Sequence, residues 1–388
     1  MPGHQPKERI YSLGFQEILL RVGTEVSYQK AVGMLNRLLH REGKAAIKGR
    51  TYQDYCQRKG KELAEYQERE SEKVLKAAGF DSITGQPLCA EEVPAVLRES
   101  GHTEIGEATI RQAAETINAE RISTNEQIQS SRQRLEATTE TVYISVDEVG
   151  VKHQKEQRKQ AVEKQGVYVW NTVAVVQSAG KCYTLSGNDT SEVFRNLLAY
   201  LLSNQLLESR NLVFFTDGAK NIQRQIETYF SFHPYTIILD WYHLKKRCQE
   251  YLSMSVKGGK EQRNAILQKL LRILWAGNVT QASAYLRELD KAVLRPVNRI
   301  ADLCGYFDKH YQHIPCYALR QRLGLRISSN RVEKANDLVV ARRQKHNGMS
   351  WSVSGSSALA QISTLFINGD ASFWLHHHFL PSFPPLAA

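Results

Sequence analysis

The sequence predicts a mixed α/β protein. In the sequence, helical segments precede and follow the segment that forms the sheet. Apolar, β-branched runs typical of strands are concentrated between residues 141 and 240, and helical periodicity dominates before and after them. A hydrophobic content of 42% is ordinary for a chain that buries a core. At 388 residues the chain is long enough for about two or three domains.

The charge balance favours a polyanionic partner. The formal net charge is +11 and the pI is near 9.3. Neutralised phosphates release counterions, so a chain of this charge gains non-specific affinity for nucleic acid. The positive residues concentrate at 37–61, 245–263 and 320–345. Solvated helix faces are the alternative explanation for each of these zones.

Cysteine use and hydropathy argue against several other classes of protein. The six cysteines are scattered without any CxxC pair, which disfavours a zinc ribbon and a disulfide framework. No run of about 18 apolar residues marks a membrane span. The N-terminal segment MPGHQPKERI lacks the apolar stretch of a secretory signal. We therefore expect a cytoplasmic protein with no membrane association.

Residues 11–140 are helical in pattern, and residues 1–114 are expected to form a helical DNA-binding region. Ser27 is a plausible N-cap for one amphipathic helix, and Thr51 could cap a second, basic helix that carries Tyr52 and Tyr55. This pair resembles a helix-turn-helix whose second helix enters the major groove. Such pairs are also common in proteins that never touch DNA. The candidate DNA contacts here are Arg50, Arg58, Lys59 and Lys61.

A second pair of helices, separated by a break that contains glycine, is predicted at residues 93–120. A second DNA-binding unit is one interpretation, but near-balanced charge favours an ordinary helical hairpin. Residues 115–140 are polar and rich in Gln and Ser, and we expect a linker there.

The pattern changes to strands at residue 141. Strands are predicted at 141–147, 166–177 and 181–187, then a helix over 191–209, a strand at 211–217, a helix at 219–230 and a strand at 235–240. Three sequential strands followed by two that alternate with helices match the ribonuclease-H-like fold, an antiparallel meander followed by parallel crossovers. Residues 141–240 are therefore expected to form the first part of such a core.

Helical periodicity returns over residues 241–325. A stretch of this length cannot be a simple loop, so an inserted helical subdomain is expected. The segment SSNRVEKANDLVVARRQKH then predicts a strong helix capped by Ser329 or Asn330. Residues 326–366 would complete the core with this helix, and residues 367–388 would form a C-terminal tail.

Three acidic residues stand out against this pattern. Asp147 and Asp217 end apolar runs, and the ends of the first and fourth strands lie side by side in the expected sheet. Glu333 lies in the basic helix after the insertion. Carboxylates are the ligands of hard cations such as Mg²⁺, and two such ions can clamp an in-line phosphoryl transfer. The sequence therefore predicts a metal site of Asp147, Asp217 and Glu333 that acts on a polyanion.

Each of these residues also has an alternative interpretation. Glu148 rivals Asp147, because successive strand side chains face opposite ways and only one of the two can face the metals. Asp217 precedes Gly218, a pair that is frequent in plain turns. Glu333 could simply pair with neighbouring cations. These cations, also candidates for contact with DNA, are Arg331, Lys334, Arg342 and Arg343.

Four motifs together carry a resemblance to a known family. They are VDEVGVKHQKEQR around Asp147, FFTDGAKNI around Asp217, ILDWYHLKKR at 238–247 and SNRVEKANDLVVARRQKHNGMSW around Glu333. In this order they resemble the catalytic domain of bacterial insertion-sequence DDE transposases, of the ISKra group within the Mutator-like superfamily. The resemblance covers residues 141–350. The segment DWYH matches the superfamily signature of Asp or Cys, two residues, then His.

The resemblance implies a ribonuclease-H-like core with an all-helical insertion. It implies that Asp147, Asp217 and Glu333 carry catalytic Mg²⁺, with Mn²⁺ as a substitute, and that Asp240 and His243 are an auxiliary pair. Lys245, Lys246 and Arg247 in the following helix are further candidate DNA contacts.

We therefore expect a transposase that binds the terminal inverted repeats of a mobile element, cleaves the double-stranded DNA and transfers the strand. A homodimer or larger synaptic complex is expected, near the bacterial nucleoid. The alternatives are a transposase-derived DNA-binding protein without cleavage activity and a ribonuclease-H-like nuclease.

Overall fold

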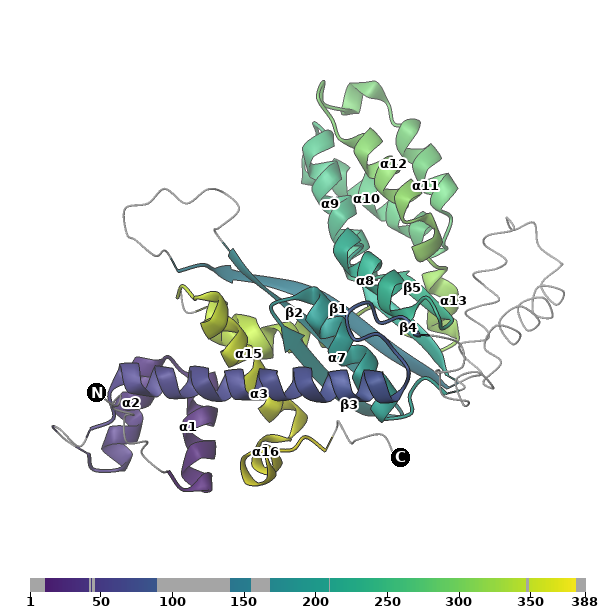
Figure 1. Ribbon diagram of the computed structural model, residues 1–388. Coiled ribbons are helices and arrows are strands. Elements are labelled where there is room, and N and C mark those ends of the chain that lie inside the picture. The colour runs from purple at the N-terminus through teal and green to yellow at the C-terminus, as the bar shows by residue number, and fades with distance from the viewer. Residues whose placement is uncertain are drawn as a thin grey trace.

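A computed structural model describes residues 11–41, 43, 46–88, 140–154, 168–208, 210–346 and 349–381. The chain forms a mixed α/β structure around a five-stranded sheet with helices on both faces (Figure 1). The expected second helical unit at 93–120 and most of the 115–140 linker lie outside the described residues. Within the described ranges, no helix combines the length and apolar character needed to cross a membrane.

The sheet contains β1 (Thr141–Lys152), β2 (Tyr168–Ser178), β3 (Lys181–Gly187), β4 (Asn211–Thr216) and β5 (Tyr235–Leu239). Its order is β3-β2-β1-β4-β5. β1, β2 and β3 pair antiparallel, whereas β4 pairs parallel to both β1 and β5. The predicted strands are confirmed, and this mixed topology is compatible with a ribonuclease-H-like fold.

β1 is longer than the sequence pattern indicates. The expected strand ended at Asp147, but pairing with β2 continues through Val149 opposite Asn171 to Lys152 opposite Tyr168. The expectation that Asp147 ends a strand is therefore wrong. The pairing of β1 with β4 does stop at Ser145, opposite Phe215. Asp147 thus lies where the edge of β1 loses its parallel neighbour.

The two faces of the sheet support separate hydrophobic clusters. Leu212 and Phe214 of β4 belong to the cluster that includes α7 (Thr190–Ser203) and α8 (Lys220–Phe230), while Val213 and Phe215 belong to the other cluster. Alternate residues of β4 are therefore buried on opposite faces, as in parallel sheets that are covered on both sides.

The second cluster consists mainly of helices between β5 and the segment of Glu333. They are α9 (Trp241–Ser255), α10 (Lys260–Trp275), α11 (Val279–Arg287), α12 (Ile300–Lys309) and α13 (Tyr317–Arg322), with short 3-10 turns at Lys291–Val293 and Tyr311–His313. Figure 1 shows α9 to α12 standing together as a bundle on one side of the sheet. Their core is continuous with the sheet, since Leu239 of β5 packs in the same cluster.

The N-terminal helices are α1 (Leu13–Glu25), α2 (Tyr28–Leu38) and α3 (Gly49–Ala77). Ser27 caps α2, as predicted, by accepting a hydrogen bond from the Lys30 backbone N–H. Thr51 does not cap the next helix, because α3 begins at Gly49 with Lys48 in the N-cap position. Figure 1 shows α3 as one long helix crossing the molecule.

One face of α3 packs against the rest of the chain. Tyr52 is buried and its hydroxyl donates to the Leu19 carbonyl, and the hydroxyl of Tyr55 donates to Gln16 Oε1 at 3.2 Å. Both tyrosines therefore serve intramolecular packing on this face of α3.

α3 crosses α15 (Val353–Asn368) at Gly60. A Cβ added to Gly60 would lie 2.2 Å from the carbonyl oxygen of Ala358 and 2.5 Å from its Cα. These contacts are with rigid backbone, so only glycine allows the two helices to approach this closely. α15 is followed by α16 (Ala371–His377).

The segment of Glu333 begins as α14 (Asn330–Asn336) and continues directly as a π-helical stretch, η5 (Asp337–Lys345). A single regular helix was predicted here. Wide i→i+5 turns are rare and are frequently found at functional sites. α14 contacts both β1 and β2, which brings Glu333 to the sheet.

Candidate active site

Asp147 and Asp217 occupy equivalent positions on neighbouring strands. In the parallel register Ser145 lies opposite Phe215, so paired residues differ by 70 in number. The same offset relates Asp147 to Asp217, immediately beyond the end of β4. The two carboxylates interact electrostatically, because the charge of Asp217 raises the pKa of Asp147.

Asp147 is held by defined partners. Its Oδ1 accepts the Glu148 backbone N–H at 2.8 Å, and its Oδ2 accepts Asn336 Nδ2 at 2.7 Å. Burial is the main reason that its pKa rises from 3.8 to about 6, and the negative charges of Asp217 and Glu333 contribute in the same direction. A positive ion at this point would relieve all three effects.

Glu148 faces the opposite side of β1. Its Oε1 accepts a hydrogen bond from Thr190 Oγ1 at 2.9 Å and from Asn221 Nδ2 at 2.7 Å. These donors belong to the first turns of α7 and α8. Glu148 therefore connects two helices to the sheet, and Asp147 is the residue directed towards α14 through Asn336.

Asp217 has the geometry of a turn residue and also lies near the other acidic residues. Its Oδ1 accepts the Ala219 backbone N–H at 2.8 Å, and Gly218 has a φ of +88°. These are the features of a turn that joins β4 to α8. The same carboxylate lies in the electrostatic neighbourhood of Asp147 and His243.

Asp240, His243 and Glu333 form a group of potential metal ligands among the described residues. One ligand atom from each lies within 4.8 Å of the others, a spacing that could hold a metal ion. Asp147 and Asp217 are outside this group. The structure therefore brings the five sequence-predicted residues into one electrostatic cluster, with Glu333 close to the Asp240 and His243 pair.

Asp240 is fully buried and hydrogen-bonded on both oxygens. Its Oδ1 accepts the His243 backbone N–H at 3.1 Å and so caps α9, while its Oδ2 accepts the backbone N–H and the hydroxyl of Ser329. Burial opposes its ionisation, but these hydrogen bonds prevail and lower the pKa of Asp240. Asp240 is thereby committed to joining α9 to the start of α14.

His243 lies among negative charges. Burial alone would lower its pKa, but the carboxylates of Asp240, Asp147 and Asp217 raise the pKa of the imidazole above 6.5. Its Nδ1 lies 3.4 Å from Asp240 Oδ1, within ion-pair distance, and this contact is the main influence that raises the pKa of the imidazole.

Glu333 forms no ion pair with any residue that the structure describes, although it stands among cations. Arg331 Nη1 instead lies 2.8 Å from Cys182 Sγ, and Arg342 Nη2 pairs with Glu25 at 3.0 Å. The salt-bridge interpretation of Glu333 therefore gains no support. Its carboxylate charge acts on Asp147.

The candidate DNA contacts divide by exposure and pairing. Lys245, Lys246 and Arg247 are exposed on α9, and Arg331 and Lys334 are exposed beside Glu333. Acidic neighbours pair with Arg247 in α9 and with Arg50, Arg58, Lys59 and Lys61 in α3.

Arg343 differs from the other candidates because it is fully buried. Its guanidinium lies over the rings of Tyr28 and Trp351, and its Nε donates to the Gly23 carbonyl at 3.1 Å. Its place is the junction between η5 and the N-terminal helices, so the expectation of a DNA contact is wrong for this residue.

Sequence reasoning missed Ser329 and Asn336 as site residues. Ser329 was proposed only as a cap for α14, but its hydroxyl serves Asp240. Asn336 lies three residues after Glu333, which places both side chains on the same face of the helix. That spacing was the available signal. A groove of about 520 Å³ adjoins these residues and includes Asp147, Glu333 and Asn336 in its lining.

Comparisons with known proteins add little to this geometry. No family model and no curated protein matches the chain. Among solved structures, the Drosophila P element transposase strand transfer complex is similar, with a TM-score of 0.22 and 9% identity over 71% of this chain and 76% of that chain. A TM-score at this level supports no conclusion about fold or function.

Proposed function

We propose that the chain is a divalent-metal-dependent enzyme that cleaves DNA at the ends of a mobile element and transfers the strand, a DDE-type transposase. The observation that supports this most strongly is that the charges of Asp217 and Glu333 both act on Asp147, which lies where β1 loses its parallel neighbour. The chain has a net charge of +11, and Lys245, Lys246 and Lys334 are exposed on the helices that carry His243 and Glu333. A phosphodiester backbone is the substrate that suits both features.

The donor set fits a hard divalent cation, Mg²⁺ or Mn²⁺. Asp147, Asp217 and Glu333 offer carboxylate oxygens, and one ligand atom from each of Glu333, Asp240 and His243 lies within 4.8 Å of the others. The Oδ1 atom of Asn336 is buried without a hydrogen-bond partner in the described structure. Bound cations would activate the attacking hydroxyl or water and stabilise the leaving oxygen.

The protein's own residues would set the geometry of the reaction. Asp240 orients α14 through Ser329 and so fixes the position of Glu333. Asn336 Nδ2 holds the carboxylate of Asp147. Such secondary contacts orient primary ligands in metal sites.

Exposed cations near the cluster would hold the DNA backbone. Lys245, Lys246 and Arg247 follow His243 on the same helix, and Arg331 and Lys334 flank Glu333. We assign these residues to phosphate contacts, which fix position without reading sequence. Recognition of the terminal inverted repeats would belong to the N-terminal region, and a dimer would hold two ends together.

A supercoiled plasmid that carries the element's ends tests this function. Incubation with Mg²⁺ should nick or linearise the plasmid, and Asp217→Asn should reduce the rate by roughly a thousandfold or more, since it removes a carboxylate from the metal site. Asp308→Asn is the matched control, because Asp308 is an exposed residue of α12. It should cleave as the wild type does.

The assay also separates the alternative functions. Equal cleavage by the wild type and Asp217→Asn would contradict the proposal. Binding of the ends without cleavage by any variant would indicate a DNA-binding protein derived from a transposase. Cleavage without any preference for the ends would indicate a ribonuclease-H-like nuclease.

A further inference from the structure

Two exposed aromatic side chains line the same groove as the acidic residues. Tyr168 and Trp170 are alternate residues of β2, with 53% and 55% of their surfaces exposed, and their ring centroids are 6.1 Å apart. The groove of about 520 Å³ is lined by both rings as well as by Asp147 and Glu333. Large aromatic side chains are normally buried, so two exposed rings beside a charged site require an explanation.

Gly150 allows Trp170 to lie across β1. The two residues are directly paired in the antiparallel register, so Trp170 projects from the same face of β1 as Glu148. The groove reaches from this face to Asp147 and Glu333 past the edge of β1 that β4 leaves unpaired. A Cβ added to Gly150 would lie 3.2 Å from Cζ3 and 3.3 Å from Cη2 of the indole. The ring therefore rests against the glycine backbone on one side. An aromatic ring that packs over a glycine of the neighbouring strand stabilises a sheet, which explains this contact. It does not explain why the ring is exposed or why Tyr168 lies beside it.

The groove around the rings is charged, which disfavours an apolar ligand. Its lining includes Lys345 and four acidic residues, Asp147, Glu148, Glu333 and Asp337, so an anionic strand would need bound cations to enter it. A nucleotide presents a flat aromatic base next to an anionic phosphate. In this groove the base would meet the rings, while the phosphate would meet Lys345 and the cations held by the carboxylates.

We propose that Tyr168 and Trp170 form a stacking platform for one unpaired base of the DNA strand that is processed at Asp147 and Glu333. The proposal rests on the proposed function, because it names the form of substrate that the same site takes. A groove of about 520 Å³ falls within the range of about 300–1,000 Å³ typical of sites for small ligands. A paired base is shielded by its neighbours, so the platform selects DNA that is distorted or frayed beside the scissile phosphate.

Binding of two short duplexes to the full chain tests the platform. One duplex carries a single unpaired 2-aminopurine and the other is fully paired, and Ca²⁺ replaces Mg²⁺ to prevent cleavage. The wild type should bind the first duplex about tenfold more tightly and should quench the 2-aminopurine fluorescence on stacking. Trp170→Ala and Tyr168→Ala should lose the preference and the quenching, while Trp170→Phe should retain part of both.

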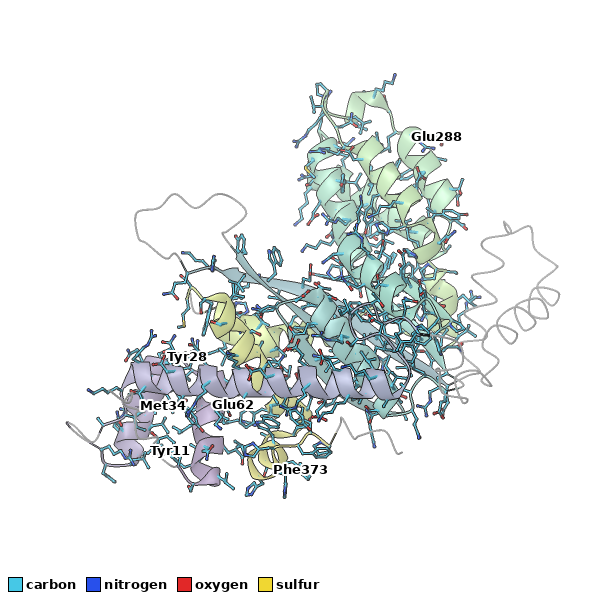
Figure 2. The ribbon with its side chains drawn as sticks, viewed as in Figure 1. Tyr11, Tyr28, Met34, Glu62, Glu288 and Phe373 are labelled. Atoms are coloured by element: carbon cyan, nitrogen blue, oxygen red, sulfur yellow. The ribbon has the colours of Figure 1, made fainter. Side chains whose placement is uncertain are left out.

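Phe373→Ala is the matched control. Phe373 is also an exposed aromatic residue, and Figure 2 shows it near the C-terminal end, away from the bundle of α9 to α12. This variant should keep the full preference for the unpaired base. Circular dichroism of each variant would confirm that binding differences do not reflect unfolding.

The outcomes distinguish this proposal from the proposed function. If the wild type cleaves plasmid in Mg²⁺ but Trp170→Ala keeps the tenfold preference and the quenching, the platform is overturned and the function stands. If the wild type binds neither duplex, both are overturned. A preference that is lost in Trp170→Ala and partly restored in Trp170→Phe supports the platform.

Discussion

Asp240 accepts two hydrogen bonds from Ser329 through a single carboxylate oxygen, one from the backbone N–H and one from the hydroxyl at 2.8 Å. These residues are 89 positions apart in the chain. The contact joins the end of β5 to the start of the helix that carries Glu333, across the whole helical insertion. These hydrogen bonds therefore hold the start of the helix that carries Glu333 as well as stabilising the fold.

Replacement of this carboxylate should affect both properties. Asp240→Ala leaves the donors of Ser329 buried without their acceptor, which should lower the free energy of unfolding by about 2–4 kcal/mol. Urea denaturation measures this loss. Ser329→Ala removes only the hydroxyl donor and should cost about 1 kcal/mol. Equal stability of Asp240→Ala and the wild type would show that the joint between α9 and α14 has no energetic role.

The crossing of α3 and α15 should tolerate only glycine at position 60. Gly60→Ala places a methyl group 2.2 Å from the Ala358 carbonyl oxygen, so the helices must separate. We expect a loss of about 3 kcal/mol or more in the free energy of unfolding, because separation of α3 and α15 loses packing contacts and any remaining overlap strains the backbone. Gly33→Ala in α2 is the control, since its added Cβ meets nothing within 4 Å. That variant should be neutral or slightly stabilising, and a similar loss in both variants would refute the packing explanation.

Cation binding should weaken in acid. The pKa of Asp147 is raised to about 6, so below that pH a proton occupies the carboxylate that a cation requires. The pKa of His243 is also raised, and its positive form repels cations at low pH. The increase in Tm caused by Mn²⁺ should therefore be several degrees larger at pH 7.5 than at pH 5, as measured by scanning calorimetry. The same increase at both values would mean that Asp147 is not a ligand.

The ionisation of Glu192 should lower the free energy of unfolding as the pH rises. Burial, together with the charge of Glu68, raises the pKa of Glu192 to about 7. The folded protein thus holds a proton that the unfolded chain releases above about pH 4.5, so stability falls between pH 4.5 and 7. Glu192→Gln should raise the Tm at pH 8 relative to the wild type and change it little at pH 4. A higher Tm of the wild type at pH 8 would contradict this sign.

Much of the sheet could be predicted from the sequence, because its strands are short apolar runs with clear boundaries. The run from Leu212 to Phe215 is buried throughout, as a strand covered on both faces must be. The end of β1 was not predictable in the same way. Polar residues after Asp147 suggest a turn, but pairing with β2 extends the strand to Lys152.

Residues of the candidate site could be predicted where the neighbouring sequence showed which strand or helix they belong to. Asp147 and Asp217 follow from strand order, since equivalent positions of adjacent parallel strands lie together. The roles of Glu148 and Arg343 depend on partners far along the chain. Glu148 is held by Thr190 and Asn221, and Arg343 by Tyr28 and Trp351. No local pattern reveals such tertiary contacts.

In the proposed active site, Asp147, Asp217 and Glu333 together hold divalent cations. Isothermal titration of the full chain with Mn²⁺ at pH 7.5 tests it most directly, using Asp217→Asn, Glu333→Gln and the control Asp308→Asn. We predict that the first two variants bind Mn²⁺ at least tenfold more weakly than the wild type, while Asp308→Asn binds as the wild type does. Unchanged Mn²⁺ affinity in both Asp217→Asn and Glu333→Gln would contradict the account.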